Sequence, residues 1–352
     1  MSIKFVRIKN LTVFDDLTVN LSSGVNVFIG QNGTGKTHLL KAIYGACEAS
    51  KLATNPHTPR VNLLEFFKSA YAKLNLFHKK NENYSDSIDI YLNTNEDNSI
   101  PSLWTGYNML PVYSDNETDK LLPITGSYHF HTPQNESFNA VFIPVKDMLT
   151  HSKGLLSMKE KYMEFPFDRT LTDILVKATQ WTLKQTPKIG VALLPKFEKI
   201  MEGTVYIENE EFFIKKHNGE LINFAVIAEG IKKFGLLWQL IMTENITEGT
   251  ILLWDEPEAN LNPEYFSLIV ESLLELSRNN VQIILTTHNY IFAKYFDVRK
   301  KENDSVKFHA LYKEDDTTQI ENANNFEELK NNSINDGFDK LIGEVYDLQV
   351  NE

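Results

Sequence analysis

The stretch Val25-Asn26-Val27-Phe28-Ile29, followed by Gly30-Gln31-Asn32-Gly33-Thr34-Gly35-Lys36-Thr37, decides the fold of this chain. The first five residues predict a short strand, and His38 to Tyr44 have the apolar spacing of a helix. The order strand, glycine-rich loop, helix is the setting of a phosphate-binding loop of the form G-x4-G-K-[ST]. Every fixed position of that pattern is present, so a chance glycine-rich loop is the weaker interpretation.

The residue types in this loop suit a phosphate group. Glycines let successive backbone N–H groups turn toward one anion without a Cβ in the way. The helix that follows points its positive N-terminal end at the same anion. Lys36 supplies a point charge to the β- and γ-phosphates, and the Thr37 hydroxyl can ligate Mg²⁺. We therefore expect residues 30–37, together with His38, to bind a nucleotide.

Two carboxylates end an apolar strand farther along the chain, Ile251-Leu252-Leu253-Trp254-Asp255-Glu256. In a fold with a phosphate-binding loop, such a strand lies beside the loop. We expect Asp255 to hold Mg²⁺ through water and Glu256 to polarise the attacking water. The alternative is a strand that ends in a solvated turn. Thr286-Thr287-His288 closes the next apolar strand, and there we expect His288 to reach the γ-phosphate rather than to serve a structural role.

Strands and helices alternate along the chain, and the central strands are apolar throughout, which predicts an α/β fold with a buried parallel sheet. Residues 79–125 are polar and predict little strand apart from 87–92. The other expected strands are 3–8, 17–21, 138–145, 248–254, 281–286 and 306–312, with a hairpin at 204–215. The expected helices are 61–78, 228–243, 263–278 and 336–346, with mostly helical sequence over 155–200.

Composition limits the class of protein. The 352 residues include 35 Lys plus Arg and 47 Asp plus Glu, giving a net charge of −12. Such an acidic chain is poorly suited to coating nucleic acid or anionic membrane with its whole surface, although a local basic groove is compatible with it. Cys47 is the single cysteine, so an intrachain disulfide is excluded, as is usual in a reducing cytoplasm. We expect a cytoplasmic protein with no membrane span and no signal peptide.

The motifs together resemble those of an ABC-type ATPase of the SMC-like and OLD-like (overcoming-lysogenisation-defect) branch. The resemblance rests on Gly30–Thr37, Ala228-Glu229-Gly230, Leu253–Glu256, Glu258–Pro263 and Thr287-His288. Two segments, Phe142–Asp147 and Ala228–Lys233, resemble stand-alone bacterial AAA-family ATPases of that branch. Several of these lie in anti-phage or toxin–antitoxin operons, including the Septu type.

The resemblance implies a P-loop ABC-ATPase head. Its expected parts are an N-terminal antiparallel β subdomain, a RecA-like parallel core, a helical signature subdomain and an α+β insert. Residues 1–50 and 138–304 are expected to form the two lobes of the head. Residues 51–137 then form the insert between the P-loop helix and the second core strand, and 305–352 a C-terminal strand and helix extension.

The resemblance also implies ATP and Mg²⁺ as cofactors and assigns residue roles. Lys36 and Thr37 become nucleotide and Mg²⁺ residues, and Asp255 becomes the second magnesium anchor. Glu256 becomes the catalytic base and His288 the switch histidine.

The same resemblance implies an ATP-dependent homodimer or higher oligomer. Ala228, Glu229 and Gly230 fall on the signature motif, which caps the γ-phosphate of the other subunit with a helix N-terminus. Asn260 falls in the D-loop, which crosses the dimer interface.

The chain departs from the family pattern at three points. Ala228 stands where the signature usually offers a serine hydroxyl, and the loss of that hydrogen bond weakens closure by about 1 kcal/mol. No Q-loop glutamine is evident, and Lys146 and Asp147 are both candidates to replace it. The long coiled coil of SMC proteins is absent.

The leading functional hypothesis is an ATPase that dimerises around ATP and gates a separate effector, a nuclease or a toxin, in anti-phage defence. One alternative is an SMC-like ATPase that binds DNA ends or DNA structures, and another is the ATPase subunit of a transporter. A lysine-rich stretch is either a solvated helical face or a nucleic-acid groove; it comprises Lys177, Lys184, Lys188, Lys196 and Lys199.

Two further groups of side chains are weaker candidates for functional sites. His129 and His131 share one face of a possible strand, which supplies half of a metal site, but no third ligand is near them in the sequence. Glu314-Asp315-Asp316 lies in a turn near the end of the chain. The segment after His288 is too short for the Toprim nuclease domain of OLD-like enzymes, so we expect no nuclease activity in this chain.

Overall fold

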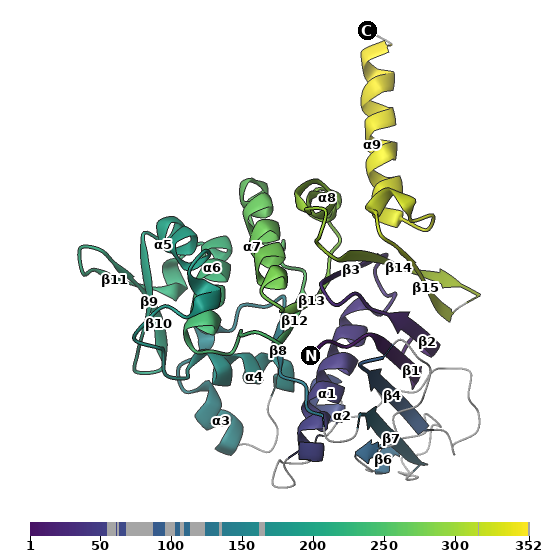
Figure 1. Cartoon of the computed structure of the whole chain (residues 1–352), viewed down its shortest axis with the longest axis horizontal. Helices are drawn as coiled ribbons and strands as arrows, with labels where there is room; N and C mark the ends of the chain where they lie inside the picture. Colours follow the sequence, from purple (N-terminus) through teal and green to yellow (C-terminus); the bar gives the residue numbers. More distant parts are fainter. Residues whose placement is uncertain are drawn as a thin grey trace, which may run out of the picture.

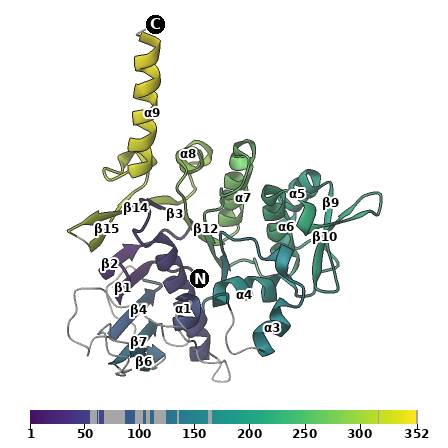
Figure 2. The same cartoon turned by 180° about the vertical axis from the view of Figure 1, so that it is seen from behind.

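Three β-sheets and the helices packed against them make up the part of the chain that the structure describes (Figure 1). The structure is a computed structural model. It describes residues 1–54, 61, 63–67, 87–95, 103–105, 109–112, 124–133, 136–161, 166–315 and 317–350. Seen from both sides, the central sheet lies between a lobe with the N-terminal sheet and a lobe with a small three-stranded sheet (Figure 1, Figure 2).

The strand before the glycine-rich loop lies inside the central sheet. The strand order is β15-β14-β3-β13-β12-β8, and each neighbouring pair is parallel except β14 with β15. The strands are β3 (Val25–Gly30), β8 (Ala140–Ile143), β12 (Ile251–Asp255), β13 (Gln282–Thr286), β14 (Val306–Glu314) and β15 (Thr317–Ala323). The prediction of an α/β fold with a parallel core is confirmed.

Both faces of the central sheet are covered, which explains why β3, β8, β12 and β13 are buried at every position and consist mostly of apolar residues. Val27 of β3 belongs to one buried core and the adjacent Phe28 to the other. On the Phe28 side, α1 (Lys36–Thr54) fills the space toward the N-terminal sheet with residues such as Leu39 and Ile43. The helix that follows the glycine-rich loop is therefore held between two sheets, and its N-terminus has a fixed position.

The N-terminal sheet contains more strands than the sequence indicated. Its order is β2-β1-β4-β7-β5, and β6 pairs with β7. The strands are β1 (Phe5–Leu11), β2 (Phe14–Asn20), β4 (Ser87–Asn93), β5 (Leu103–Thr105), β6 (Met109–Val112) and β7 (Ile124–Thr132). The predicted strand over 87–92 is confirmed as β4, but the short strands β5 and β6 also lie in the segment 79–125, where no further strand was expected. Both β5 and β6 are short and pair with β7, and such tertiary pairing outweighs intrinsic strand propensity.

The opposite lobe holds the predicted hairpin and a group of helices. Strands β9 (Gly203–Glu208) and β10 (Glu211–Lys216) pair antiparallel, and β11 (Leu221–Asn223) adds to β10. Both residues of the tight turn, Asn209 and Glu210, have positive φ, as two-residue hairpin loops favour. The helices are α3 (Leu155–Lys161), α4 (Arg169–Ala178), α5 (Leu194–Met201) and α6 (Glu229–Met242). The predicted helix over 228–243 is confirmed as α6.

Further helices cover the other end of the chain. They are α7 (Phe266–Arg278), α8 (Tyr290–Arg299) and α9 (Ser333–Val350). The C-terminal helix α9 is longer than the predicted 336–346 and projects away from the body (Figure 1). Of the predicted helix over 61–78, α2 (Leu63–Phe67) is observed, and 68–78 lie outside the described residues. Among the described helices, none combines the length and apolar character needed to cross a membrane.

Candidate functional site

The glycine-rich loop connects β3 to α1, and its backbone needs glycine. Gly30 has a φ of 147°, and a Cβ there would lie 2.2 Å from the carbonyl oxygen of Leu311. Gly35 has a φ of 91°, and a Cβ there would lie 2.5 Å from the side chain of Val13. Thr34 closes the loop from within by donating its hydroxyl to the carbonyl oxygen of Gln31 at 2.8 Å. The loop is a close-packed backbone cradle that side chains would obstruct.

Lys36 extends back into this cradle. Its Nζ donates to the carbonyl oxygens of Gly30 at 2.8 Å and Gln31 at 2.9 Å. Burial lowers the Lys36 pKa to about 8, against the opposing effect of the Glu256 and Asp255 charges. The ammonium group therefore donates to two loop carbonyls, and among the described residues no carboxylate accepts a hydrogen bond from it, so phosphate oxygens could replace these carbonyl partners.

Thr37 and Asp255 meet at the N-terminus of α1. The Thr37 hydroxyl donates to Oδ2 of Asp255 at 2.9 Å. The other carboxylate oxygen, Oδ1, accepts the hydroxyl of Thr286 at 2.5 Å. This chain of hydrogen bonds joins α1, β12 and β13 at the carboxyl ends of the parallel strands. Hydroxyl and carboxylate oxygens are the donors that Mg²⁺ prefers, so the pair fits a Mg²⁺ ion bound beside the loop.

Glu256 follows Asp255 in a backbone conformation unusual for its type. Its φ is 47°, in the left-handed region, and its N–H donates to the Thr286 hydroxyl at 3.1 Å. Such backbone strain is concentrated at functional sites. Burial, followed by the nearby Asp255 charge, raises the Glu256 pKa. A carboxylate with a raised pKa is better suited to accept a proton from water.

His288 lies beside Glu256 from the end of the next strand. Its Nε2 is 3.4 Å from Oε1 of Glu256. Burial, followed by the charge of Lys36, lowers the His288 pKa, so the ring is neutral near pH 7. Four residues predicted as site residues, Lys36, Asp255, Glu256 and His288, are therefore brought together at one edge of the sheet.

A buried glutamate that the sequence assigned no role holds His288 in place. Oε1 of Glu258 accepts the Thr287 hydroxyl at 2.6 Å and the backbone N–H of His288 at 3.0 Å. Burial raises the Glu258 pKa, and within the described residues its Oε2 has no hydrogen-bond partner. Glu258 lies in the quoted motif Glu258–Pro263, so its position was visible in the sequence, but its buried contact with the next strand was not.

Lys233 is a second residue without a predicted role. From α6, its Nζ donates to the carbonyl oxygens of Pro257 at 2.8 Å and Glu256 at 3.4 Å. Burial lowers its pKa to about 8. A lysine on α6 therefore bonds directly to the backbone of the candidate catalytic glutamate.

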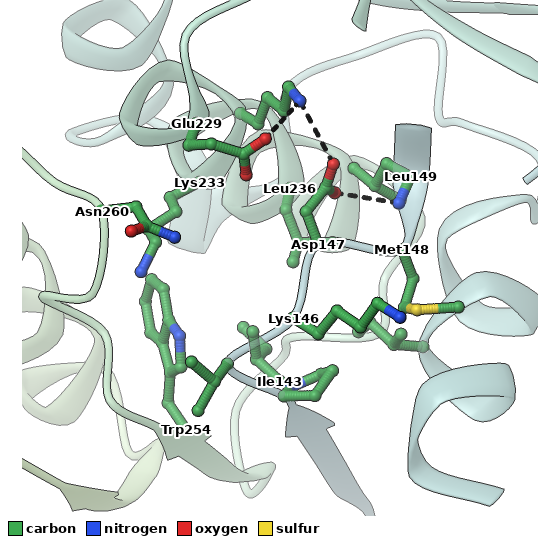
Figure 3. Close-up of a pocket in the computed structure, with 14 residues that line it drawn as sticks. Ile143, Lys146, Asp147, Met148, Leu149, Glu229, Lys233, Leu236, Trp254 and Asn260 are labelled. Atoms are coloured by element: carbon green, nitrogen blue, oxygen red, sulfur yellow. Dashed lines mark hydrogen bonds and ion pairs between the residues drawn. The ribbon is translucent and has the colours of Figure 1, made fainter. Parts of the chain in front are cut away.

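The N-terminal part of α6, where the sequence predicts the signature motif, borders a cavity (Figure 3). Lys146, Asp147, Glu229, Lys233 and Asn260 line it, together with Trp254. No side chain caps the N-terminus of α6, and Ala228 and Glu229 are exposed there. Asn260 has a positive φ of 57°.

Both candidates for the missing Q-loop glutamine border this cavity. Asp147 lies 3.4 Å from Nζ of Lys232, a lysine on α6 that is also paired with Glu229 at 2.7 Å. Lys146 lies 4.7 Å above the ring of Phe167. Of the two, Asp147 is the residue that forms an ion pair with α6, through Lys232.

The remaining predicted residues lie around the loop. Gln31, Asn32 and Gly33 are exposed at its tip. His38 is half-buried, and its Nδ1 is 3.0 Å from the Thr12 hydroxyl. His38 therefore contacts the β1–β2 turn in addition to lying next to the loop.

Residues 25–293 match the model of a family described as "AAA domain, putative AbiEii toxin, Type IV TA system". An "ATP/GTP phosphatase" of Helicobacter pylori is 20% identical over 354 residues, covering 89% of this chain and 93% of the relative. The "DNA replication and repair protein RecF" of Clostridium botulinum is 39% identical over 74 residues, 21% of this chain. The chain spans about a fifth of the length of the RecF relative it matches.

Solved structures of SMC heads have a similar fold. An SMC head bound to the C-winged helix domain of ScpA aligns with a TM-score of 0.52 and 14% identity, covering 92% of this chain and 98% of that chain. A Pyrococcus furiosus SMC head with an extended coiled coil, bound to the C-terminal domain of ScpA, gives 0.50 and 13%, covering 98% and 99%. These likenesses show the fold of an SMC head.

Proposed function

We propose a function that starts from an established premise. The chain belongs to the AAA-domain family described as putative AbiEii toxin, Type IV TA system, and is an ATPase of the AAA type. In the proposed function, the chain binds ATP with Mg²⁺, dimerises around the nucleotide and signals to a separately encoded effector. The observation that carries the ATPase site is the convergence of Lys36, Thr37, Asp255, Glu256 and His288 at one edge of the parallel sheet.

The loop residues would bind the phosphates. Backbone N–H groups of residues 30–37 and the N-terminus of α1 face the anion, and Lys36 exchanges its carbonyl partners for phosphate oxygens. Thr37 and Asp255 would hold Mg²⁺, which supplies charge neutralisation for the phosphates when bound. Thr286 keeps the Asp255 carboxylate oriented through its hydrogen bond to Oδ1.

Glu256 would accept the proton of the attacking water. Its raised pKa and its position beside His288 support that role. His288, neutral near pH 7, would donate a hydrogen bond at the γ-phosphate, with Glu258 fixing its backbone N–H. Lys233 would hold the carbonyl oxygen of Glu256 from the signature helix.

Dimerisation would complete the site. The N-terminus of α6 has no side-chain cap among the described residues, and Ala228 and Glu229 are exposed there, with Gly230 half-buried. In the proposed head-to-tail dimer these N–H groups face the γ-phosphate held by the other subunit, and Asn260 lies at the interface. Light scattering of the Glu256→Gln variant tests this step. A mass that doubles with ATP supports it, whereas a monomer at every ATP concentration contradicts it.

A protein effector, in an anti-phage or toxin–antitoxin setting, is the proposed receiver of the ATP signal. The family description supports that setting. Helix α9 projects from the body of the molecule (Figure 1). Its large apolar side chains are exposed to solvent, which supports a protein partner. The exposed fractions are 54% for Leu341, 51% for Ile342, 66% for Tyr346 and 70% for Leu348.

Capture from the native host tests the effector. Tagged Glu256→Gln protein with ATP should retain a partner encoded next to its own gene. If capture requires ATP, the Lys36→Ala protein should not retain that partner. The double variant Leu341→Asp/Ile342→Asp should also fail to retain the partner, although it keeps its ATPase activity. Equal capture by all three proteins would contradict ATP-gated docking on α9.

A nucleic-acid-binding ATPase is the second candidate. The RecF relative is named for DNA replication and repair, and Lys184, Lys188, Lys196 and Lys199 are exposed on the α5 side of the molecule. Binding to labelled DNA that rises with ATP and weakens steeply with salt would favour this function. Unchanged DNA binding after neutralising the four lysines would exclude this lysine surface as the site.

A further inference from the structure

Two imidazoles and a carboxylate converge on the outer face of the N-terminal sheet, remote in sequence from the nucleotide motifs. Strands β4 and β7 pair in parallel, and the register places Asp89 directly opposite His129. His131 lies two residues farther along β7 and therefore on the same face. The sequence places no third ligand near the two histidines, but the pairing of β4 with β7 brings the distant Asp89 within reach of both rings.

The three side chains point at one another. Oδ1 of Asp89 lies 3.0 Å from Nδ1 of His129 and 2.8 Å from Nε2 of His131. One ligand atom from each residue lies within 4.8 Å of the other two. Two ligands at about 2.0–2.2 Å from one tetrahedral Zn²⁺ ion are about 3.3–3.6 Å apart. That separation is longer than the two Asp89–imidazole contacts and shorter than 4.8 Å, so rotations of the three side chains would let them surround an ion.

Neighbouring groups already orient the ligands. The Ser87 hydroxyl donates to Oδ2 of Asp89, which leaves Oδ1 directed at the histidines. The Tyr91 ring stacks on His131 with centroids 4.1 Å apart and planes at 9°. Outer partners of this kind fix ring and carboxylate orientation in metal centres. The three side chains are between 14% and 18% exposed, so an ion can enter from solvent and then be largely enclosed.

We propose that Asp89, His129 and His131 bind a divalent transition-metal ion of the Zn²⁺ class. Imidazole nitrogens favour zinc and its neighbours over Mg²⁺ or Ca²⁺, which prefer all-oxygen sites. Three protein ligands leave a further coordination position for water or an added ligand. The ion ties β4 to β7, two strands that are adjacent in space but separated by a long segment of chain, and thereby stabilises the N-terminal sheet. The site is separate from the Mg²⁺ position at Thr37 and Asp255.

Metal titration of the full chain tests the proposal. Chelator-treated wild type, kept in excess Mg²⁺, should take up a single Zn²⁺ ion per chain by calorimetry and elemental analysis. Co²⁺ in its place should give a visible d–d spectrum typical of imidazole ligation. Zn²⁺ should also raise the unfolding midpoint of the wild type. The matched control His217→Ala removes an exposed histidine elsewhere and should keep all three results.

The variants decide the assignment. His129→Ala/His131→Ala should lose the Zn²⁺ uptake, the Co²⁺ spectrum and the thermal shift. Asp89→Asn keeps the shape of the side chain and should weaken Zn²⁺ binding by more than about tenfold. Circular dichroism and ATP turnover show whether each variant is folded. Absence of Zn²⁺ uptake by the wild type, or unchanged uptake by the folded double-histidine variant, would overturn the proposal and leave the cluster as a hydrogen-bonded network.

Discussion

Lys36 places its ammonium group inside the phosphate loop, bonded to two carbonyl oxygens. Lys36→Ala removes the main side-chain counterion for the β- and γ-phosphates, so ATP binding should fall below detection. Isothermal calorimetry measures this directly. Lys340→Ala, which removes an exposed lysine on α9, serves as the matched control and should bind like wild type. A Lys36→Ala protein with wild-type affinity would show that the loop is not the nucleotide site.

Glu256 combines a left-handed backbone conformation with a raised pKa. Glu256→Gln keeps the size of the side chain but cannot accept a proton. ATP binding should persist while turnover falls by about two to four decades, the range for a positioned base. Phosphate release under saturating ATP provides the measurement. Turnover equal to wild type would mean that another residue activates the water.

The pH dependence of turnover should report Glu256. Only its ionised form accepts a proton, so the rate should fall as pH drops through its pKa, and burial places that pKa above the ordinary 4.5. The His288 pKa lies below its ordinary 6.5, mainly because of burial, so His288 is neutral near pH 7. A pH–rate profile measures this loss of rate at low pH, and circular dichroism excludes acid unfolding as its cause. If the same loss of rate persists unchanged in Glu256→Gln, a group other than Glu256 causes it.

At the residue scale, the sequence predicts the residues whose spacing is local and misses those whose partners are distant. The loop and the pair Asp255-Glu256 were visible because each motif is contiguous. Glu258 and Lys233 act on backbone atoms of another segment, and no spacing in one sequence encodes that contact. Asp89 was missed for the same reason, since its histidine partners come from another strand.

At the element scale, Lys233 connects α6 to the end of β12. Its Nζ donates to the backbone carbonyl oxygens of Glu256 and Pro257, so a movement of α6 would shift the backbone at Glu256. Lys233→Gln should leave the dissociation constant for ATP unchanged and reduce turnover by about ten- to a hundredfold, the worth of a buried charged hydrogen bond. Steady-state kinetics and calorimetry on the same preparation separate the two effects. Lys196→Gln, at an exposed position on α5, is the control. An equal loss of ATP affinity would make Lys233 a general structural residue instead.

The elements most easily predicted were those with strong patterns of their own. The buried strands β3, β12 and β13 and the helices α6 and α7 have continuous apolar runs or clear periodicity. The short strands β5 and β6 have neither and exist because β7 pairs with them. The extra length of α9 had no core-facing pattern to indicate it, because much of its apolar surface is exposed.

At the scale of the whole molecule, the glycine-rich loop and the predicted signature segment, Ala228–Gly230, belong to different parts of the structure. The loop opens at the end of β3, whereas the N-terminus of α6 belongs to the opposite lobe, where it borders the cavity with Asn260 (Figure 1, Figure 3). The central claim is that each ATP is held between the loop of one subunit and the signature segment of another. This claim can be tested by mixing two inactive variants, one altered in the loop and the other in the signature segment.

The decisive measurement is the ATPase activity of Lys36→Ala protein mixed with Ala228→Arg protein. Ala228 is exposed, so the arginine should be tolerated by the fold while obstructing the signature helix N-terminus. If sites form between subunits, the mixed dimer contains one intact site, built from the loop of the Ala228→Arg chain and the signature of the Lys36→Ala chain. The two proteins, each nearly inactive alone, should therefore regain part of the wild-type rate when they are mixed. No recovery at any ratio, with dimers verified by light scattering, would contradict it.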